Sequence, residues 1–529
     1  MYIGTHARTA PDRLALIVSS TGEVLTYRDL DARSNQLAQY LHAQGLRRGD
    51  TVALFMENNP RFMEVVWAAR RSGLYLTAVN RYLTVDEAAY TIEDSDAVVL
   101  IASHARAEVA AALPARLPHC GSFLMTDGTI PGWSAYEAAV APFPAHPLDT
   151  EWLGELMLYS SGTTGRPKGV RRPLSEAKVG EEDLLQQVVR GYGFDEHTVY
   201  LSPAPMYHAA PLAFSLGVQH TGGTVVMMPH FDAAEALELI ARHRVTHSQW
   251  VPTMFVRMLK LPEAERRRFD LSSHRCAIHA AAPCPVAVKQ AMIEWWGPIL
   301  EEYYGGTEGN GLTRISSPEW LAHPGSVGRT VIGVLHICDE AGAEILEGEP
   351  GLVYFERDTM PFAYYKDPAR TAAAQHPVHP TWSTLGDVGY LDAEGYLYLT
   401  DRKAFMIISG GVNIYPREVE DVLIGHPAVR DVAVFGLPDP EMGEQVKAVV
   451  EVMDGVTPSD ALAAELIAYG RAHLAHFKAP KSVDFCDVLP RLPTGKLYKQ
   501  ALRAQYLARE RTSTVRIIDR SDTALTGLP

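Results

Sequence analysis

The sequence predicts an α/β protein with a large N-terminal domain of doubly wound sheets, a small β-rich subdomain, and a small α+β C-terminal domain. Helix and strand signals alternate as far as residue 303, which is typical of mostly parallel sheets covered by helices on both faces. From residue 325 onward, Gly-rich turns separate short apolar runs. A second alternation follows Asp401-Arg402, and 529 residues are too many for one ordinary domain.

The first elements predict a βαβ-like unit. Thr26 and Asp29 have the spacing of a capping box, and Gly45 is placed to end the helix that they begin. The elements expected after it are strands at 52–56, 74–79, 97–102, 198–202, 224–228, 246–250, 276–280 and 299–303, and helices at 60–72, 85–94, 209–220, 232–243 and 285–296.

The remaining elements define the β-rich subdomain and the C-terminal domain. We place the domain boundary at 401–404, which gives domains 1–401 and 402–529, and we expect a loose tail from residue 512. The strands expected in the subdomain are 334–338, 352–355 and 396–399; the C-terminal domain is expected to contain helices at 416–425 and 459–475 and strands at 429–436, 444–452 and 482–486.

Composition excludes several classes of protein. The formal net charge of −15 argues against nucleic-acid binding. No apolar run approaches the roughly 20 residues that span a bilayer, and the N-terminus lacks the pattern of an export signal. Five cysteines form no CxxC pair, which predicts a reduced, cytoplasmic protein without structural zinc.

The segment Tyr159–Val170 has the composition of a phosphate-binding loop. Two glycines allow the backbone to approach an anion closely, Ser and Thr hydroxyls add neutral donors, and Lys168 adds a positive charge. A Walker A loop would continue into a helix after Gly-Lys-Ser/Thr, whereas Pro167 and Gly169 oppose helix formation here. A polar surface turn is the alternative interpretation.

Further segments, in matching order, give the loop a family context. They are Tyr304-Gly-Gly-Thr-Glu308, Leu385-Gly-Asp387, Asp401-Arg402 and Pro490-Arg-Leu-Pro-Thr-Gly-Lys496. Together with the loop, they resemble the adenylate-forming superfamily, which contains acyl- and aryl-CoA synthetases, over residues 20–505. The resemblance implies an enzyme that uses ATP, Mg²⁺ and coenzyme A. A carboxylate would attack the α-phosphate of ATP, and preorganised donors would stabilise the charge that develops.

The resemblance also implies roles for individual residues. Lys496 would be the principal catalytic cation, assisted by Thr164, and Glu308 would bind Mg²⁺. Each of three residues also has a purely structural interpretation: a backbone cap for Glu308, a turn residue for Asp387 and a surface lysine for Lys496. The residues expected to bind ATP or AMP are Ser160, Ser161, Gly162, Thr163, Thr164, Gly165, Lys168, Ala281, Ala282, Pro283, Tyr304, Gly305, Thr307, Asp387 and Arg402.

The acyl pocket is expected to be apolar. His208 lies where the family has a gate between the nucleotide and acyl sites, but a buried structural histidine is an equally open interpretation. The segments expected to line the pocket contain no charged residue that could pair with the amino group of an amino acid. A hydrophobic carboxylic acid therefore fits, whether a fatty acid, an aryl acid or a steroid side-chain acid. The residues expected to line the pocket are His208, Trp250, Met254, Ala280 and Gly306.

Coenzyme A is expected to bind the C-terminal domain. By resemblance, this domain rotates after adenylation, and Ser409-Gly410-Gly411 offers a backbone edge to pantetheine. Lys478 and Lys481 belong to a late basic stretch that could meet the CoA phosphates, although a solvated basic face is the alternative. Ala404 departs from the family, which has a polar hinge residue at this position.

Three functions remain open from the sequence. The first is an ATP-dependent acid–CoA ligase, favoured because no carrier-like domain accompanies the chain. The second is an enzyme that loads a carrier protein. The third is a catalytically silent nucleotide-binding protein, opposed by the joint presence of Lys168, Glu308, Asp387 and Lys496. The expected partners are small molecules, and a homodimer stays open.

Overall fold

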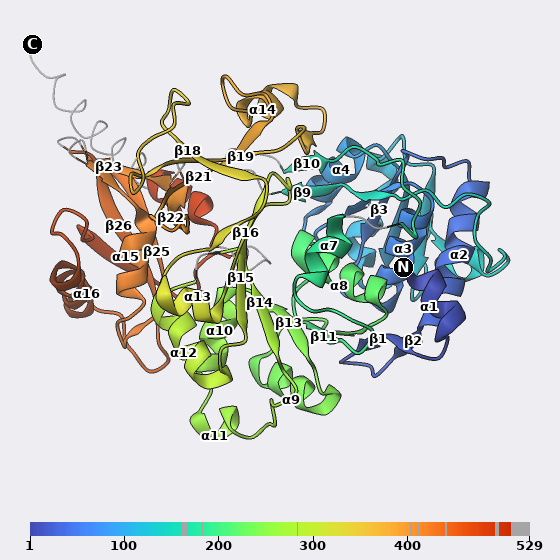
Figure 1. Cartoon of the computed structure of the whole chain (residues 1–529), viewed down its shortest axis with the longest axis horizontal. Coiled ribbons are helices and arrows are strands. Elements are labelled where there is room, and N and C mark those ends of the chain that lie inside the picture. The colour runs from blue at the N-terminus through green and yellow to red at the C-terminus, as the bar shows by residue number, and fades with distance from the viewer. Residues whose placement is uncertain are drawn as a thin grey trace, which may run out of the picture. The chain divides into compact units, whose positions relative to one another are not determined.

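The computed structural model describes residues 1–160, 167–181, 184–282, 284–402, 405–409, 412–439, 442–491 and 497–508. The chain forms two compact units. The N-terminal unit comprises Met1–Cys284, Val288–Leu335 and Phe355–Ser383. The C-terminal unit comprises Pro285–Ala287, His336–Tyr354 and Thr384–Pro529. The α/β class predicted from the sequence is confirmed (Figure 1).

The largest sheet formed by the described residues has nine strands and a parallel centre. Its strands β1, β12, β11, β13, β14 and β15 pair in parallel, while β2, β16 and β17 add antiparallel edges. The strands in spatial order are β17 (Arg329–Ile332), β16 (Leu312–Ser316), β15 (Leu300–Tyr304), β14 (Cys276–His279), β13 (His247–Trp250), β11 (Val199–Ser202), β12 (Thr224–Met227), β1 (Leu14–Val18) and β2 (Val24–Thr26).

A second sheet, of six described strands, is parallel throughout. Its central strand β3 is buried at every position, as expected for a parallel strand with both faces covered. The strands in spatial order are β7 (Ser134–Ala135), β6 (Ser122–Thr126), β5 (Ala97–Ser103), β3 (Thr51–Phe55), β4 (Tyr75–Ala78) and β8 (Glu155–Leu156).

Several helices of the N-terminal unit, among them α2, α3 and α9, begin at a residue whose side chain caps the helix. Thr26 and Asp29 form the predicted capping box of α2, and Gly45 follows the helix with a φ of +94°. α2 and α3 pack against each other (Figure 1). The principal helices are α1 (Ile3–Thr9), α2 (Tyr27–Ala43), α3 (Pro60–Arg71), α4 (Val85–Asp94), α7 (Leu184–Arg190), α8 (Ala209–Thr221), α9 (Ala233–His243), α10 (Pro252–Leu259), α12 (Val286–Trp296), α13 (Ser317–Ala322) and α14 (Pro368–Ala373).

Two smaller sheets were only partly predicted. One is an antiparallel sheet in the order β20 (Ala363–Tyr364), β10 (Lys168–Arg171) and β9 (Leu158–Ser160). The sequence did not predict it, because two- to four-residue strands carry almost no periodic signal. The other is the β-rich subdomain, whose order is β18 (Val334–Cys338), β19 (Gly351–Glu356), β21 (Trp382–Leu391) and β22 (Leu397–Arg402).

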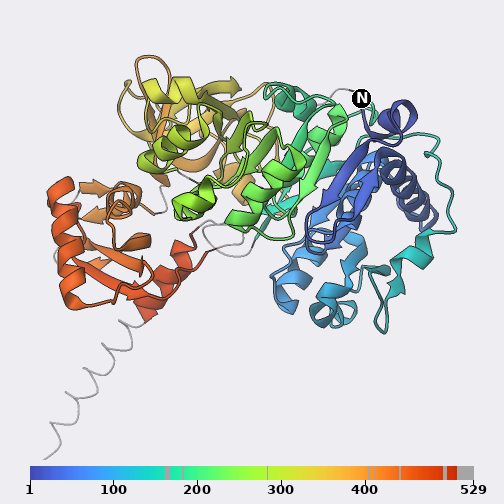
Figure 2. The ribbon, with the colours of Figure 1, turned by 90° about the horizontal axis from the view of Figure 1, so that it is seen from below.

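The C-terminal unit contains a sheet that is buried on both faces (Figure 2, orange and red). In β25, Val432 and Val434 face the cluster beneath α15 and α16, whereas Ala433 and Phe435 face the cluster of Leu502. Its elements are β23 (Ile407–Ser409), β24 (Val412–Ile414), α15 (Pro416–Leu423), β25 (Val429–Asp439), β26 (Gly443–Val452), α16 (Asp460–His473) and β27 (Ser482–Cys486).

Within these ranges, every helix is too short or too polar to cross a lipid bilayer.

Candidate active site

The predicted phosphate loop begins and ends on an antiparallel hairpin. Ser160 at the end of β9 lies opposite Lys168 at the start of β10, so the two flanks of the loop are held side by side (Figure 1). The residues predicted to touch phosphate between them lie outside the described residues: Ser161, Gly162, Thr163, Thr164 and Gly165. The structure therefore gives the base of the loop and the position of its lysine.

Tyr364 joins the phosphate hairpin to the predicted metal ligand. The Tyr364 hydroxyl donates to Oε1 of Glu308 over 2.9 Å. Lys168 Nζ lies 4.5 Å from the centroid of the same aromatic ring, within the range of a cation–π contact. Lys168, predicted to bind phosphate, and Glu308, predicted to bind the metal, therefore both contact the side chain of Tyr364. Tyr364 is not among the residues predicted from the sequence.

Two arginines hold the turn that carries Glu308. The N–H of Gly309 donates to the carbonyl of Gly306, and Gly309 has a φ of +67°, which closes a tight turn. Arg172 Nη2 donates to the carbonyl of Thr307 over 2.8 Å, and Arg357 Nη1 donates to the carbonyl of Gly309 over 3.1 Å. Since Arg172 follows β10 directly, its hydrogen bond ties the hairpin to this turn, whereas Arg357 ties the turn to the end of β19.

The surroundings of Glu308 fit a magnesium ligand. The side chain is buried, and Oε1 accepts the tyrosine hydroxyl, while no described residue is bonded to Oε2. Mg²⁺ in phosphate-transfer sites is typically held by one or two carboxylates together with substrate phosphates. In the described ranges no group of three or more His, Cys, Asp or Glu could hold a metal ion.

The segment that follows β14, where Ala281, Ala282 and Pro283 are predicted to bind ATP or AMP, contains a strained residue. Ala281 has a φ of +74°, a left-handed conformation that costs a non-glycine residue roughly 1–2 kcal/mol. Ala281 is exposed and Ala282 is half-buried, so their backbone groups are available to a ligand, and Pro283 lies outside the described residues. Strain retained in an exposed loop is typical of binding sites.

Tyr304 ends β15 beside this loop. Its ring is half-buried and lies 6.1 Å from the ring of Phe355 at an interplanar angle of 33°. A side chain at position 305 would be crowded, since a Cβ would stand 3.0 Å from the carbonyl oxygen of Gly311. β15 therefore delivers Tyr304, Gly305, Thr307 and Glu308 in one short, tightly constrained segment.

A buried ion pair joins α12 to β15, the strand that leads into the segment of Glu308. Lys289 Nζ in α12 donates to Oε2 of Glu302 in β15 over 2.6 Å, and Lys289 has no exposed surface. His279, the last residue of β14, lies 3.7 Å from the same carboxylate oxygen. Burial, and then the positive charge of Lys289, lower the pKa of His279 well below its ordinary value. The imidazole is therefore neutral beside the pair.

His208 is the N-cap residue of α8, at the start of the predicted acyl segment. Part of the residue is exposed, but Nε2 is buried and has no hydrogen-bond partner among the described residues. Burial lowers the pKa of His208 to about 3. A neutral imidazole whose Nε2 has no described hydrogen-bond partner is compatible with the predicted gate, which stays a prediction.

The other predicted pocket residues differ in their surroundings. Trp250 has no exposed surface and packs among aromatic rings that include Phe255 and Trp296, with its indole N–H donated to Ser248. This environment is that of a core residue. Met254 and Ala280 are also buried. Gly306 lies in the turn of Glu308, where its carbonyl accepts the N–H of Gly309.

In the C-terminal unit, Asp387 and Arg402, which the sequence predicts to bind ATP or AMP, lie opposite each other. Asp387 in β21 pairs with Arg402 in β22 across the antiparallel ladder, and Gly386 precedes Asp387 with a φ of +78°. Residues that face each other across such a ladder have their Cβ atoms about 4.5–5.5 Å apart. Asp387 is buried, and the side chain of Arg402 lies outside the described residues.

The segment that carries Lys496 is closed at its base. Arg491 and Leu497 form an antiparallel bridge, and the N–H of Tyr498 donates to the carbonyl of Pro490 over 2.8 Å. Arg491 Nε also donates to Asp431 over 2.8 Å. Lys496 itself lies outside the described residues, as do Gly410 and Gly411 of the predicted pantetheine edge.

The basic stretch of the C-terminal unit is internally paired. Lys478 Nζ donates to both carboxylate oxygens of Glu418 over 2.7 Å, and Lys481 Nζ donates to Asp439 over 2.9 Å. Ser409, at the end of β23, pairs with Val412 and Gly443. The two lysines proposed for CoA therefore already have carboxylate partners, which a CoA phosphate would have to displace or join.

The sequence analysis missed Tyr364, Arg172 and Arg357. Each acts through a contact with a residue far away in the sequence, and each stands in an unremarkable local pattern of aromatic or basic residues. No signal in a single sequence distinguishes them from core tyrosines or surface arginines.

Comparison with known proteins agrees with this geometry. A family model described as "AMP-binding enzyme" matches residues 4–365, and one described as "AMP-binding enzyme C-terminal domain" matches residues 418–496. The chain therefore belongs to the AMP-binding, adenylate-forming enzymes. Within that superfamily, its relatives place it in the acyl-CoA synthetase branch.

Two curated relatives and one solved structure illustrate the similarity. A feruloyl-CoA synthase from Amycolatopsis sp is 34% identical over 504 residues, covering 95% of this chain and 97% of the relative. The long-chain-fatty-acid–CoA ligase FadD13 of Mycobacterium tuberculosis is 32% identical over 507 residues, with the same coverage. ATP-bound MatB from Rhodopseudomonas palustris superimposes with a TM-score of 0.82 at 28% identity, covering 96% of this chain and 99% of MatB.

Proposed function

We propose that this protein is an ATP-dependent acid–CoA ligase that activates a hydrophobic carboxylic acid as an acyl-adenylate and transfers the acyl group to coenzyme A. The observation that carries the proposal is the convergence of Lys168 and Glu308 on Tyr364. A cation beside the phosphate hairpin and a carboxylate with an available oxygen are the groups that ATP with a divalent cation requires.

The roles of the residues follow from their chemistry. Glu308 would hold Mg²⁺, which when bound neutralises charge on the phosphates. Lys168 would stabilise the departing pyrophosphate, and Asp387 would accept hydrogen bonds from the ribose hydroxyls. Lys496 would stabilise the charge that develops as the carboxylate attacks the α-phosphate.

The proposed acid is apolar, either a fatty acid or an aryl acid. Ligases for a long-chain fatty acid and for ferulate are both relatives of this chain. On the chain itself, Met254 and Ala280 are buried, and His208 is neutral because its pKa is lowered to about 3. A neutral, apolar lining supports an uncharged acyl group rather than an amino acid.

We also propose that the enzyme works in the cytoplasm. None of the five cysteines is in a disulfide bond, and four of them are buried. Cysteines that form no disulfide are typical of a reducing compartment.

The test is a pyrophosphate-release assay over a panel of fatty and aryl acids, with and without CoA. We expect acid-dependent release with ATP and Mg²⁺, and an acyl-CoA thioester as the product when CoA is present. Lys496→Ala should abolish adenylate formation and leave ATP binding largely intact. Pyrophosphate release at an unchanged rate in Lys496→Ala would refute the role of this lysine.

Other outcomes would identify the alternative functions. Acyl-adenylate that accumulates with CoA present and reacts only when a carrier protein is added would indicate a carrier-loading enzyme. Binding of ATP without pyrophosphate release for any acid in the panel would indicate a silent nucleotide-binding protein.

A further inference from the structure

We propose that Tyr364 is a positioning residue for adenylation: its hydroxyl orients Glu308 toward the divalent cation, and its ring orients Lys168 toward the pyrophosphate portion of ATP. This inference rests on the proposed function, because it refines the same nucleotide site. It assigns one residue two separable contacts with two oppositely charged groups.

The position of Tyr364 is fixed by its own surroundings. It lies in β20, where it pairs with Val170 of β10, and its backbone N–H donates to Oγ1 of Thr371 over 2.9 Å. The side chain is 7% exposed and packs against Val170, Phe362 and Ala374. A ring held this firmly presents its face and its hydroxyl in defined directions, as a positioning group requires.

The hydroxyl contact constrains Glu308. A carboxylate side chain has several rotatable bonds, and a cation ligand is effective only if its oxygen is already directed at the metal. Tyr364 donates to Oε1, which leaves Oε2 as the oxygen without a bonded partner among the described residues. The arginines on the carbonyls of Thr307 and Gly309 fix the backbone, and Tyr364 fixes the side chain.

The ring contact constrains Lys168. A lysine ammonium on a long flexible stem loses rotamer freedom when it binds a phosphate. The Tyr364 ring, 4.5 Å from Nζ, favours a limited set of conformations before ATP arrives. Because the ring and the hydroxyl are chemically distinct, substitutions can remove one contact and retain the other.

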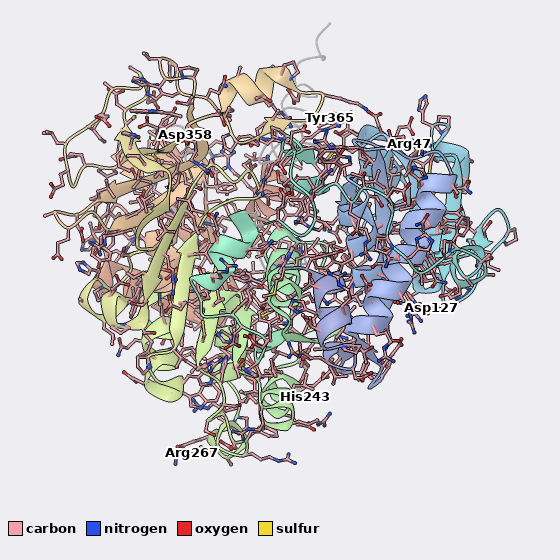
Figure 3. All side chains as sticks on the ribbon, turned by 45° about the vertical axis from the view of Figure 1, so that its right-hand side comes forward. Arg47, Asp127, His243, Arg267, Asp358 and Tyr365 are labelled. Carbon is pink, nitrogen blue, oxygen red and sulfur yellow. The ribbon has the colours of Figure 1, made fainter. Side chains whose placement is uncertain are left out.

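The experiment uses Tyr364→Phe, Tyr364→Leu and a matched control, Tyr365→Phe. Tyr365 (labelled in Figure 3) is the next residue, and its hydroxyl donates to Asp96 rather than to Glu308. The primary measurement is the binding of Mn²⁺, followed by its EPR signal, to full-length protein with a non-hydrolysable ATP analogue. The second is binding of the analogue without metal, followed by calorimetry.

We expect Tyr364→Phe to raise the dissociation constant for Mn²⁺ by about 10-fold or more, as is usual when the hydrogen-bond partner of a metal ligand is lost. Binding of the analogue without metal should be unchanged in this variant, since the ring beside Lys168 is kept. Tyr364→Leu should weaken both kinds of binding. Tyr365→Phe should weaken neither.

A kinetic measurement separates positioning from a general structural role. In Tyr364→Phe, the Mg²⁺ concentration for half-maximal pyrophosphate release should rise, while kcat at saturating Mg²⁺ returns to the wild-type value. A structural defect would instead lower kcat at every Mg²⁺ concentration.

Two results would overturn the inference. One is Mn²⁺ binding in Tyr364→Phe as tight as in the wild type, and the other is an equal loss in Tyr364→Phe and Tyr365→Phe. If Tyr364→Leu does not fold, Tyr364→Phe still decides the question. Absence of turnover with every acid would refute the proposed ligase function, whereas the Mn²⁺ measurement would still test Tyr364.

Discussion

Replacing Lys289 by Met would test how α12 is held against β15, the strand that leads into the segment of Glu308. Lys289 has no exposed surface, and its ammonium lies 2.6 Å from Glu302, which is itself 4% exposed. The substitution keeps the length of the side chain and removes its charge. Glu302 would then remain buried without its ammonium partner, next to His279, whose pKa is still lowered by burial.

The expected effect is large. Removing one partner of a buried ion pair typically destabilises a protein by about 3–5 kcal/mol, out of a domain stability of about 5–15 kcal/mol. Removing both partners is much less harmful, because no unpaired charge is left buried. We therefore expect the double variant Lys289→Met/Glu302→Leu to recover most of the loss.

The assay is urea unfolding followed by tryptophan fluorescence, since the ring of Trp320 lies 4.9 Å from Lys289 Nζ. The loss of unfolding free energy in Lys289→Met should become smaller as the pH is lowered from 8 to 5, because protonation neutralises the unpaired carboxylate of Glu302. If the single and double variants were equally destabilised at all pH values, the loss would come from packing, and the ion-pair reasoning would be refuted.

Two further predictions concern pH and backbone strain. Burial lowers the pKa of His208 and His274 to about 3 and that of His247 to about 4. Below pH 6.5, the ordinary pKa of histidine, these residues are therefore more protonated in the unfolded chain than in the folded chain. The free energy of unfolding should be fully retained above pH 6.5 and should fall as the pH drops further, by up to about 1.4 kcal/mol per pH unit for each histidine. A urea midpoint that stays constant from pH 7 to pH 5 would contradict this prediction. Ala281→Gly should relieve the left-handed backbone at φ +74° and raise stability by up to about 1 kcal/mol in the same assay, whereas a lower urea midpoint would show that the loop is unstrained.

Much of the fold could be read from the sequence because its long elements have strong periodic signals. The capping box at Thr26 and Asp29, the buried strand β3 and the helix α16 are all found where the sequence predicted them. The short strands β9, β10 and β20 were not predicted, because strands this short contain too few residues to show a period.

The sequence also predicted which segments carry the chemistry. Motif order led to the adenylate-forming class, which the family models confirm for this chain. The roles of Glu308, Asp387 and Lys496 stay predictions that the proposed experiments address. The CoA assignment of Lys478 and Lys481 rested on local charge alone, and local charge does not reveal that each lysine has a carboxylate partner some 40 to 60 residues away.

By itself, the sequence determined the class of fold, the family and the segments that bear the reactive groups, since these depend on periodicity, composition and motif order along the chain. Only the tertiary structure decided that Lys168 and Glu308 meet at Tyr364, that Arg172 and Arg357 fix the turn between them, and that Lys289 is buried with Glu302. The physical reason is that hydrogen bonds, cation–π contacts and desolvation depend on distances in space, and these residues, 13 to 196 positions apart in the sequence, approach one another only when the sheets and helices assemble.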